Sequence, residues 1–252
     1  MRRIHLTVEY DGTDYAGWQR QSNAMTVQEQ LERAVKRLTG ETVCVSGASR
    51  TDAGVHALGQ SAHFDTESRI PADKFSFALN TLLPPDIRVV RSEEVSAEFH
   101  SRFSGHGKRY RYLIHAAPHA GALDRRTHAH VIYPLDVEKM RREALDLVGT
   151  HDFAAFAASG SVVKDTVRTI YRVEVSQRGS EICLIVEGSG FLYNMVRIIA
   201  GTLIGVGSGK LAPGAFRRAI ESGSRLDLGV TAPAHGLTLM EVFYTLEEEN
   251  RK

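Results

Sequence analysis

The order of strand-like and helix-like segments is the feature that most constrains how this chain can fold. Residues 4–10 alternate apolar and polar side chains with a period of two, which is typical of a strand with one buried face. Thr26 and Glu29 then form a capping box, and apolar residues recur at helical spacing from Val27 until Gly40. The chain therefore begins with a strand that is followed by an amphipathic helix.

The rest of the first half repeats these two kinds of segment. Pro71 suits the first turn of a second helix, and Pro84-Pro85 ends it. Strand patterns cover residues 42–46, 60–64 and 87–95. We expect these elements to form one lobe over residues 1–105.

The second half, residues 106–252, resembles the first in its plan. Its segments are a strand at 108–116, a helix from Asp136 to Val148, a hairpin of 166–175 and 181–186, a helix at 191–206, a shorter helix after Pro213 and a strand at 238–245. Most links are hairpin-like, which predicts an α+β fold of two similar α/β lobes with a continuous, largely antiparallel sheet and helices on its outer face. No low-complexity linker separates the lobes, so a cleft between them is the expected site. The charged tail at 247–252 is expected to fray.

The composition is that of an ordinary soluble protein, with 42% hydrophobic and 24% charged residues. Its longest apolar runs fall far short of the roughly 20 residues that a membrane helix needs. The alternation that starts at Ile4 leaves no room for the apolar core of a signal peptide. The two cysteines, Cys44 and Cys183, are expected to be reduced core residues. These features predict a cytoplasmic protein without a membrane segment.

Charge is distributed unevenly, although the formal net charge is only +1. From Phe99 to Leu123 there are 25 residues without a single Asp or Glu. The cations of this segment are Arg102, Lys108, Arg109 and Arg111, beside four histidines. On a strand, Tyr110 and Tyr112 share one face, and aromatic rings interleaved with cations suit the bases and phosphates of unstacked RNA. A core-facing tyrosine stripe with solvated arginines outside explains the same pattern.

The stretch GASRTDAGVHALGQ, residues 47–60, places Asp52 among small residues and two positions after Arg50. One interpretation is a tight turn at Asp52-Ala53-Gly54 whose carboxylate binds its own backbone. The other is a glycine-rich floor that lets a bulky ligand approach the backbone closely. Arg50 would favour the ionised form of Asp52, and an ionised aspartate in a dry pocket is suited to act as a nucleophile.

Two further patterns are dismissed as sites. Residues 205–211 are similar to a phosphate loop, but they follow a helix and have Leu211 where Ser or Thr would bind magnesium, so they indicate the glycine-rich end of that helix. His128 and His130 have no third ligand nearby in the sequence, which argues against a metal site. The sequence therefore predicts neither a metal nor a nucleotide cofactor.

Five segments stand out together, in order from the first strand to the last. They are Tyr10-Asp11-Gly12 with Gly17-Trp18-Gln19-Arg20-Gln21, residues 47–60, Lys108-Arg109-Tyr110-Arg111-Tyr112, residues 191–197, and Thr231-Ala232-Pro233 with Gly236-Leu237. This combination resembles the TruA family of tRNA pseudouridine synthases. The resemblance implies the pseudouridine synthase fold and an isomerase, without metal or cofactor, that converts uridines 38, 39 and 40 in the anticodon arm of tRNA. It also implies a homodimer with the catalytic cleft between two lobes.

The resemblance assigns roles to single residues. Asp52 corresponds to the nucleophile, Arg50 pairs with it and helps to hold the flipped nucleotide, and Tyr110 stacks on the uracil as candidate acid or base. The implied and expected substrate-binding residues are Phe191, Arg197, Leu237, Lys108, Arg109, Arg111 and Arg102. Among them, Arg197 is the implied partner of Asp52. Ser49 and Asn194 depart from the family pattern, which more often has glycine and histidine there.

Two other functions remain open from the residues. A binding module of the same fold, without catalysis, would use the basic segment and the tyrosines alone. A glycosidase-like hydrolase would need a second carboxylate within about 10 Å of Asp52. Asp11 and Asp14 are the obvious candidates, but as neighbours of Gly12 they are better explained as turn formers.

Overall fold

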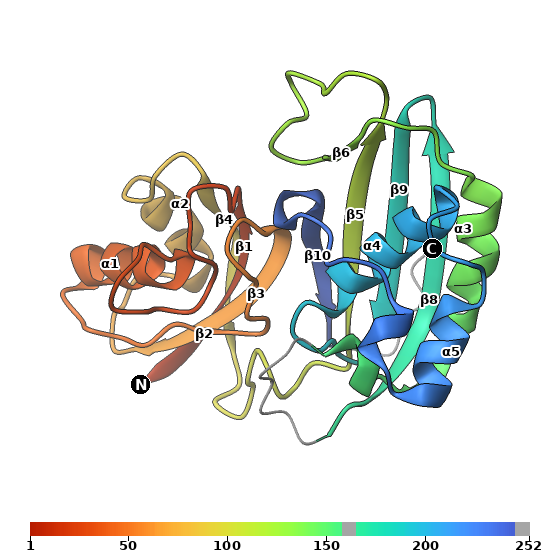
Figure 1. Cartoon of the computed structure of the whole chain (residues 1–252). Coiled ribbons are helices and arrows are strands. Elements are labelled where there is room, and N and C mark those ends of the chain that lie inside the picture. The colour runs from red at the N-terminus through yellow and green to blue at the C-terminus, as the bar shows by residue number, and fades with distance from the viewer. Residues whose placement is uncertain (158–164, 245–252) are drawn as a thin grey trace. The chain divides into compact units, whose positions relative to one another are not determined.

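A computed structural model of the chain describes residues 1–157 and 165–244 (Figure 1). These residues form two compact units: the first combines Met1–His106 with the chain from Thr238, and the second is Gly107–Leu237. The division lies beside the expected boundary at residue 105, but the last strand groups with the first unit rather than the second. Both units mix strands and helices, so the α+β class is confirmed. The tail at 247–252, expected to fray, lies outside the described residues.

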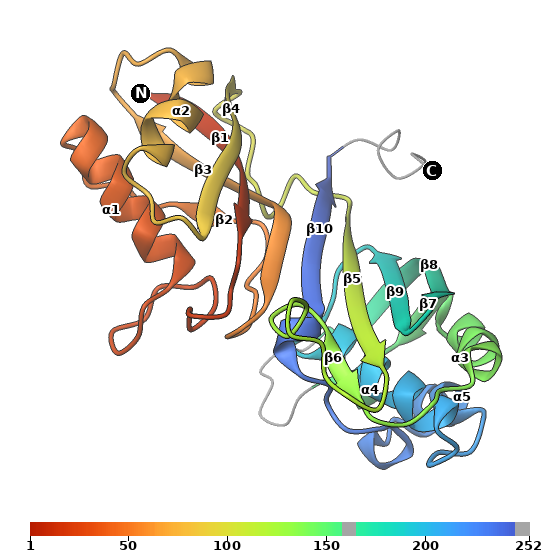
Figure 2. The same cartoon turned by 90° about the horizontal axis from the view of Figure 1, so that it is seen from above.

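The first unit is a sheet with two helices on the same side of it (Figure 2). Its elements are β1 (Arg2–Tyr10), α1 (Val27–Thr39), β2 (Ser46–Gly47), β3 (His56–Thr66), α2 (Phe75–Asn80), β4 (Ile87–Val95) and β10 (Leu237–Phe243). The order of the main strands is β4-β1-β3-β10, and β2 pairs with β3. β1 is antiparallel to both neighbours, whereas β10 joins β3 in parallel through Thr238↔His56.

The first strand and the first helix form as their sequences predict. Ile4, Leu6 and Val8 are fully buried on one face of β1. The Thr26 side chain accepts from the backbone N–H of Glu29 and caps the start of α1. The helix ends at Gly40, whose left-handed φ of 79° suits glycine. Local signals therefore fix both ends of this helix.

The strand expected at 42–46 is wrong except for its end, because only Ser46–Gly47 forms β2. The backbone N–H of Val45 donates to the Glu32 side chain of α1 at 3.1 Å instead of to a strand. Cys44, expected in the core, is exposed as a result. β3 begins at His56 rather than at residue 60, since its pairing with β1 extends to Ala57.

The helix expected after Pro71 is shorter than predicted. A 3-10 turn at Ala72–Lys74 leads into α2, which ends at Asn80 and not at Pro84. The Asn80 amide nitrogen donates to the Val89 carbonyl at 3.0 Å, and its oxygen accepts from the Val89 N–H at 2.8 Å. These contacts join the end of α2 to β4.

The second unit is also a sheet with helices on one side of it (Figure 2). Its elements are β5 (Gly107–Ala116), β6 (Ala129–Val131), α3 (Val137–Ala144), β7 (Gly149–Asp152), β8 (Val167–Arg178), β9 (Glu181–Gly188), α4 (Met195–Gly207) and α5 (Ala215–Ser222). The strand order is β5-β9-β8-β7, all antiparallel, and β6 pairs with β5 in parallel. The predicted hairpin of β8 and β9 is confirmed, with its turn at Gly179 (φ of 60°).

Two helices of the second unit differ from their expected bounds. Asp136 caps α3 as predicted, but the α-helix ends at Ala144 and continues only as a 3-10 turn. The helix expected from residue 191 begins at Met195, because Asn194 adopts a left-handed conformation. The glycine-rich segment after α4 is the end of that helix, as predicted, with Gly209 at a φ of 74°. Cys183 is only half-buried.

Candidate functional site

Asp52 opens a tight turn in the first unit. The Val55 N–H donates to the Asp52 carbonyl at 3.1 Å, and Gly54 has a left-handed φ of 77°. The turn interpretation of Asp52-Ala53-Gly54 is therefore confirmed for the backbone. Asp52 is half-buried, so it is neither sealed in the core nor fully solvated.

The last residue of β1 and the loop that follows it hold this turn at three points. The Trp18 N–H donates to the Thr51 carbonyl at 3.1 Å, and the Gly54 N–H donates to the Tyr15 carbonyl at 3.3 Å. The buried hydroxyl groups of Tyr10 and Thr51 are hydrogen-bonded, 2.7 Å apart. The backbone on both sides of Asp52 is thus fixed by a second segment of the chain.

Gly12 and Gly17 let that loop lie directly against the Asp52 turn. A Cβ at Gly12 would lie 2.0 Å from the Val55 carbonyl oxygen, and a Cβ at Gly17 would lie 2.4 Å from the Thr51 carbonyl oxygen. Gly17 also has a φ of 89°, which residues with a side chain rarely adopt. Sequence reasoning noted both glycines only as part of a resemblance. Their structural role is to allow close contact between two backbones.

Two small residues of segment 47–60 serve the packing of the chain itself. A Cβ at Gly47 would lie 2.4 Å from the ring of Trp18, which is 1% exposed. A Cβ at Gly59 would lie 2.4 Å from the Met240 carbonyl oxygen. Packing within the chain therefore explains the glycines at Gly47 and Gly59, and the glycine-rich floor for a ligand stays a prediction.

The first unit carries two more of the predicted site residues, Arg50 and Arg102. Both are exposed. Within residues 1–157 and 165–244, neither arginine has an ion-pair partner. The predicted pairing of Arg50 with Asp52 stays a prediction, and both guanidinium groups keep their charge available for an anionic ligand.

Asp11 forms a turn, as the sequence predicts. Its carboxylate accepts from the Thr13 backbone N–H at 3.0 Å and from the Thr13 hydroxyl at 2.6 Å. The same carboxylate lies 3.1 Å from Nδ1 of His56. The Gly12 N–H donates to that nitrogen at 3.0 Å. Asp11 therefore supports the start of the loop that holds the Asp52 turn.

The second unit brings Tyr110 and Phe191 together. Their ring centroids are 5.1 Å apart and their planes meet at 85°, an edge-to-face arrangement. Tyr110 is 9% exposed, and Phe191 is half-buried. Tyr110 lies on β5 opposite Val186 of β9, so the antiparallel ladder fixes its position.

Tyr112 supports the loop that leads to Leu237. It is fully buried, its hydroxyl donates to the Pro233 carbonyl at 2.8 Å, and a Cβ at Gly236 would lie 2.6 Å from its ring. Burial raises the pKa of Tyr112, although the charge of Arg197 opposes this shift. The core-facing interpretation of the tyrosine stripe is therefore right for Tyr112. Leu237 itself is 6% exposed.

Arg197 is held by two neutral acceptors of its own unit. Its Nε donates to the Ala232 carbonyl at 2.8 Å, and a terminal nitrogen donates to Oδ1 of Asn194 at 2.8 Å. Asn194 has a φ of 63°, the one left-handed residue other than glycine in the described part of the chain. Strained backbone of this kind is concentrated at functional sites. Asn194 thus starts α4 and orients the guanidinium group of Arg197.

The three cations expected on β5 are half-buried. Nε of Arg109 donates to Glu187 at 2.7 Å, and the Glu187 side chain is only 5% exposed. A buried carboxylate without a charged partner is strongly destabilising, so the ion pair with Glu187 holds Arg109 within the sheet. Nε of Arg111 is buried without a hydrogen-bond partner among the described residues. The contact of Arg109 with a phosphate, predicted from the sequence, has to compete with this ion pair.

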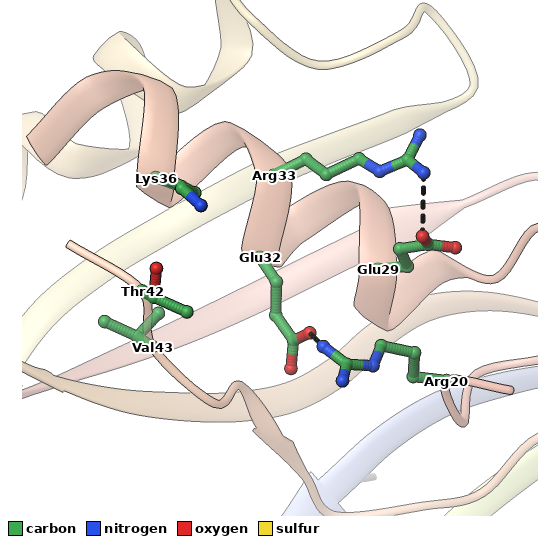
Figure 3. Close-up of a pocket in the computed structure, with 7 residues that line it drawn as sticks. All are labelled: Arg20, Glu29, Glu32, Arg33, Lys36, Thr42 and Val43. Carbon is green, nitrogen blue, oxygen red and sulfur yellow. Dashed lines mark hydrogen bonds and ion pairs between the residues drawn. The ribbon is translucent and has the colours of Figure 1, made fainter. Parts of the chain in front are cut away.

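A separate pocket of about 230 Å³ lies beside α1 in the first unit (Figure 3). Its lining residues are Arg20, Glu29, Glu32, Arg33, Lys36, Thr42 and Val43. Arg20 pairs with Glu32 at 3.0 Å, and Arg33 pairs with Glu29 at 2.8 Å. Most of its charges therefore compensate one another, and none of the predicted site residues lines it.

Two other kinds of feature are absent from the described residues. Within them, no three side chains of His, Cys, Asp or Glu lie together as metal ligands would. The helices of the same residues include none with the length and apolar character that spanning a membrane requires.

Comparison with known proteins shows similarity along most of the chain. Residues 6–104 and 144–245 match the family described as tRNA pseudouridine synthase. The chain is 54% identical over 245 residues to the tRNA pseudouridine synthase A of Ruminiclostridium cellulolyticum, a match that covers 97% of this chain and 100% of the relative. It is 53% identical over 244 residues to the tRNA pseudouridine synthase A of Acetivibrio thermocellus, with the same coverage.

A solved structure is similar at a lower level. One chain of the crystal structure of a Cbf5-Nop10-Gar1 complex matches with a TM-score of 0.40 and 12% identity. This match covers 94% of the present chain and 49% of that chain.

Proposed function

The chain belongs to the tRNA pseudouridine synthase family, and we propose that it converts uridines 38, 39 and 40 in the anticodon arm of tRNA to pseudouridine with Asp52 as the nucleophile. The family makes the chain an isomerase that acts on tRNA. The observation that carries the proposal for Asp52 is its place in the fold. It is a half-buried carboxylate in a turn whose backbone is held from both sides.

The chemistry requires one strong nucleophile and a proton acceptor. The bond from ribose C1′ to uracil N1 breaks, the base turns, a bond from C1′ to C5 forms, C5 loses its proton, and N1 gains one. The carboxylate of Asp52 starts this sequence by attack at C1′, by addition to C6 of the uracil, or by removal of a proton from C2′. The reaction is an isomerisation, so atoms and electrons balance without a further reactant.

Tyr110 and Arg50 are proposed to act on the same nucleotide. A base in the stacked anticodon arm has to be flipped out, which costs a few kcal/mol. Stacking on Tyr110 offsets part of that cost, and the exposed Arg50 helps to hold the nucleotide out of its helix. Tyr110, or a water that it orients, is the proposed base for the proton on C5.

The remaining predicted residues are proposed to bind the substrate. Lys108, Arg102 and Arg111 contact phosphates, while Arg109 contributes mainly through its ion pair with Glu187. Phe191 and Leu237 contact the base. We further propose a cytoplasmic homodimer, as expected from the sequence.

The family assignment argues against both alternatives raised by the sequence. The relatives carry the name of an enzyme over their full length, which a non-catalytic binding module would not explain. A hydrolase would need a second carboxylate, and Asp11 is engaged with Thr13 in a turn.

Asn194 supplies a prediction about Arg197. Asn194→Gly keeps the left-handed backbone but removes the acceptor, so kcat/KM is expected to fall about tenfold, as loss of a hydrogen bond to a charged group does. Asn194→Asp keeps an acceptor in a residue that tolerates this backbone, and kcat/KM should stay within about threefold. Both thermal midpoints and initial rates are measured. A glycine variant as active as the parent chain would show that the amide does not position Arg197.

Release of tritium from C5-labelled uridine in unmodified tRNA tests the proposed function. Wild-type protein should release tritium from a transcript with uridine at 38, 39 and 40. A transcript that keeps uridine at only one of these positions should release the tritium of that one uridine. A transcript with cytidine at all three positions is the matched control. Release from that control at the same rate would contradict the proposed sites, and no release from any transcript would contradict the activity itself.

A further inference from the structure

Phe103 is an exposed aromatic residue in the segment that follows β4. Its side chain is 76% exposed. Its ring lies 4.4 Å from the ring of His100 with the planes at 35°, and the guanidinium carbon of Arg102 lies 5.6 Å from the Phe103 centroid. These three side chains, His100, Arg102 and Phe103, form a surface that is called here the Phe103 platform.

Buried polar groups hold the backbone beneath the platform. Ser101 is fully buried, its N–H donates to Nδ1 of His63 at 3.2 Å, and its hydroxyl lies 2.9 Å from the same nitrogen. Burial lowers the pKa of His63 to about 4, so the ring is neutral at pH 7 and Nδ1 can accept. The Tyr244 hydroxyl donates to the Ser101 carbonyl at 2.6 Å. The backbone that carries the platform is therefore held in place before any ligand binds, which lowers the entropic cost of binding.

The charge around the platform favours an anionic ligand. Arg102 lies in the segment from Phe99 to Leu123, which has no Asp or Glu. In the described residues it also has no carboxylate partner. A cation without a counter-ion beside an exposed ring combines the two contacts that a nucleotide offers, a base face and a phosphate.

A second exposed phenylalanine of the same unit lacks this combination. Phe77 is 69% exposed, and the Lys74 Nζ lies 5.4 Å from its ring centroid. Lys74, however, pairs with Asp73 at 2.9 Å. Phe77 thus matches Phe103 in residue type and exposure but not in charge, and the chain offers it as a control.

We propose that an unstacked nucleotide of the RNA substrate binds the Phe103 platform, with its base on the Phe103 ring and a phosphate on Arg102. Stacking is open to all four bases, so this contact adds affinity without sequence preference. The inference rests on the proposed function for the identity of the RNA, a tRNA. It adds a binding site outside the Asp52 turn and the Tyr110–Phe191 pair.

Four variants test the platform in the full-length protein. Phe103→Ala is expected to raise the Kd for unmodified tRNA, and KM with it, about tenfold, while kcat stays within about twofold because the platform does not contact the reacting atoms. Phe103→Tyr keeps the ring, and Phe77→Ala removes the control ring, so both should leave the Kd within about twofold of the parent value. Arg102→Gln should reduce the slope of log Kd against log salt by about 0.7–0.9, as one lost phosphate contact does.

The outcomes separate this inference from the proposed function. A Phe103→Ala protein that is folded by circular dichroism and binds tRNA as tightly as Phe77→Ala overturns the platform. The platform would also be overturned if Phe103→Ala left the Kd for tRNA unchanged but altered the mass of the protein in sedimentation. That result would assign the surface to contact with another protein chain. The Kd is measured by titration and needs no turnover. An inactive wild-type protein would therefore contradict the proposed function, whereas the ratio of the Kd values of Phe103→Ala and wild-type protein would still test the platform.

Discussion

Replacement of Asp52 by asparagine is expected to lower the rate of pseudouridine formation at least about 10³-fold, as loss of a nucleophile does in other enzymes. The amide has nearly the size of the carboxylate, so the turn should persist, but it carries no charge and does not attack carbon. Affinity for tRNA should change less than about threefold, since the affinity for a polyanion comes mainly from contacts of cations with phosphates, which a carboxylate does not make. Tritium release under single-turnover conditions and a tRNA titration measure the two quantities.

Asp73→Asn is the matched control for this change. Asp73 is an exposed carboxylate of the same unit, paired with Lys74 on the surface, so its loss should leave turnover within about twofold. An Asp52→Asn protein that keeps more than about a tenth of the parent rate would contradict the assignment of Asp52 as nucleophile.

Replacement of Gly17 by alanine is expected to give the second-largest loss of activity, about 100-fold in kcat. The new Cβ would lie 2.4 Å from the Thr51 carbonyl oxygen, at a φ of 89°. Relief of that contact has to move the backbone beside Asp52, and a displacement of about 1 Å in an active site can cost about 10²-fold. Stopped-flow or quench measurement of kcat at saturating tRNA tests this expectation.

Gly40→Ala separates the steric effect from the backbone effect. Gly40 has a similar φ of 79° at the end of α1, but no atom of the described residues lies within 4 Å of its would-be Cβ. Both variants should lose about 1–2 kcal/mol of stability from the left-handed backbone, measured by urea unfolding. Only Gly17→Ala should lose kcat. Equal kcat values in the two folded variants would show that the loop after β1 does not position Asp52.

Local signals predicted much of the fold, and long-range contacts explain most of the differences. The caps at Thr26 and Gly40 set the ends of α1 because they depend on neighbours within one turn. The segment at 42–46 has the pattern of a strand, but the Val45 N–H is taken by Glu32 of a helix earlier in the chain. The grouping of β10 with the first unit likewise depends on pairing with β3, far away in the sequence.

The candidate site shows the same division between local and distant information. Asp52 and its turn could be predicted from residues 52–54 alone, because Asp, Ala and Gly carry a local turn signal. The contacts of Tyr10, Tyr15 and Trp18 with that turn join segments about 40 residues apart, and no local pattern records them. Asn194 was visible only as a departure from a family pattern. The left-handed backbone at this position and the hydrogen bond from Arg197 explain why an asparagine suits it.

A covalent trap tests most directly whether the Asp52 carboxylate bonds to the nucleoside. In tRNA that contains 5-fluorouridine, fluorine replaces the C5 hydrogen that must leave as a proton, so the last step is blocked. In the route by addition to C6, the carboxylate is still bonded to the ring when that step is reached. By this route wild-type protein should form an adduct with this tRNA that survives a denaturing gel, with the nucleoside on the tryptic peptide that begins at Thr51, and Asp52→Asn protein should form none. An adduct of equal yield with the asparagine variant, or on a peptide without Asp52, would contradict the account.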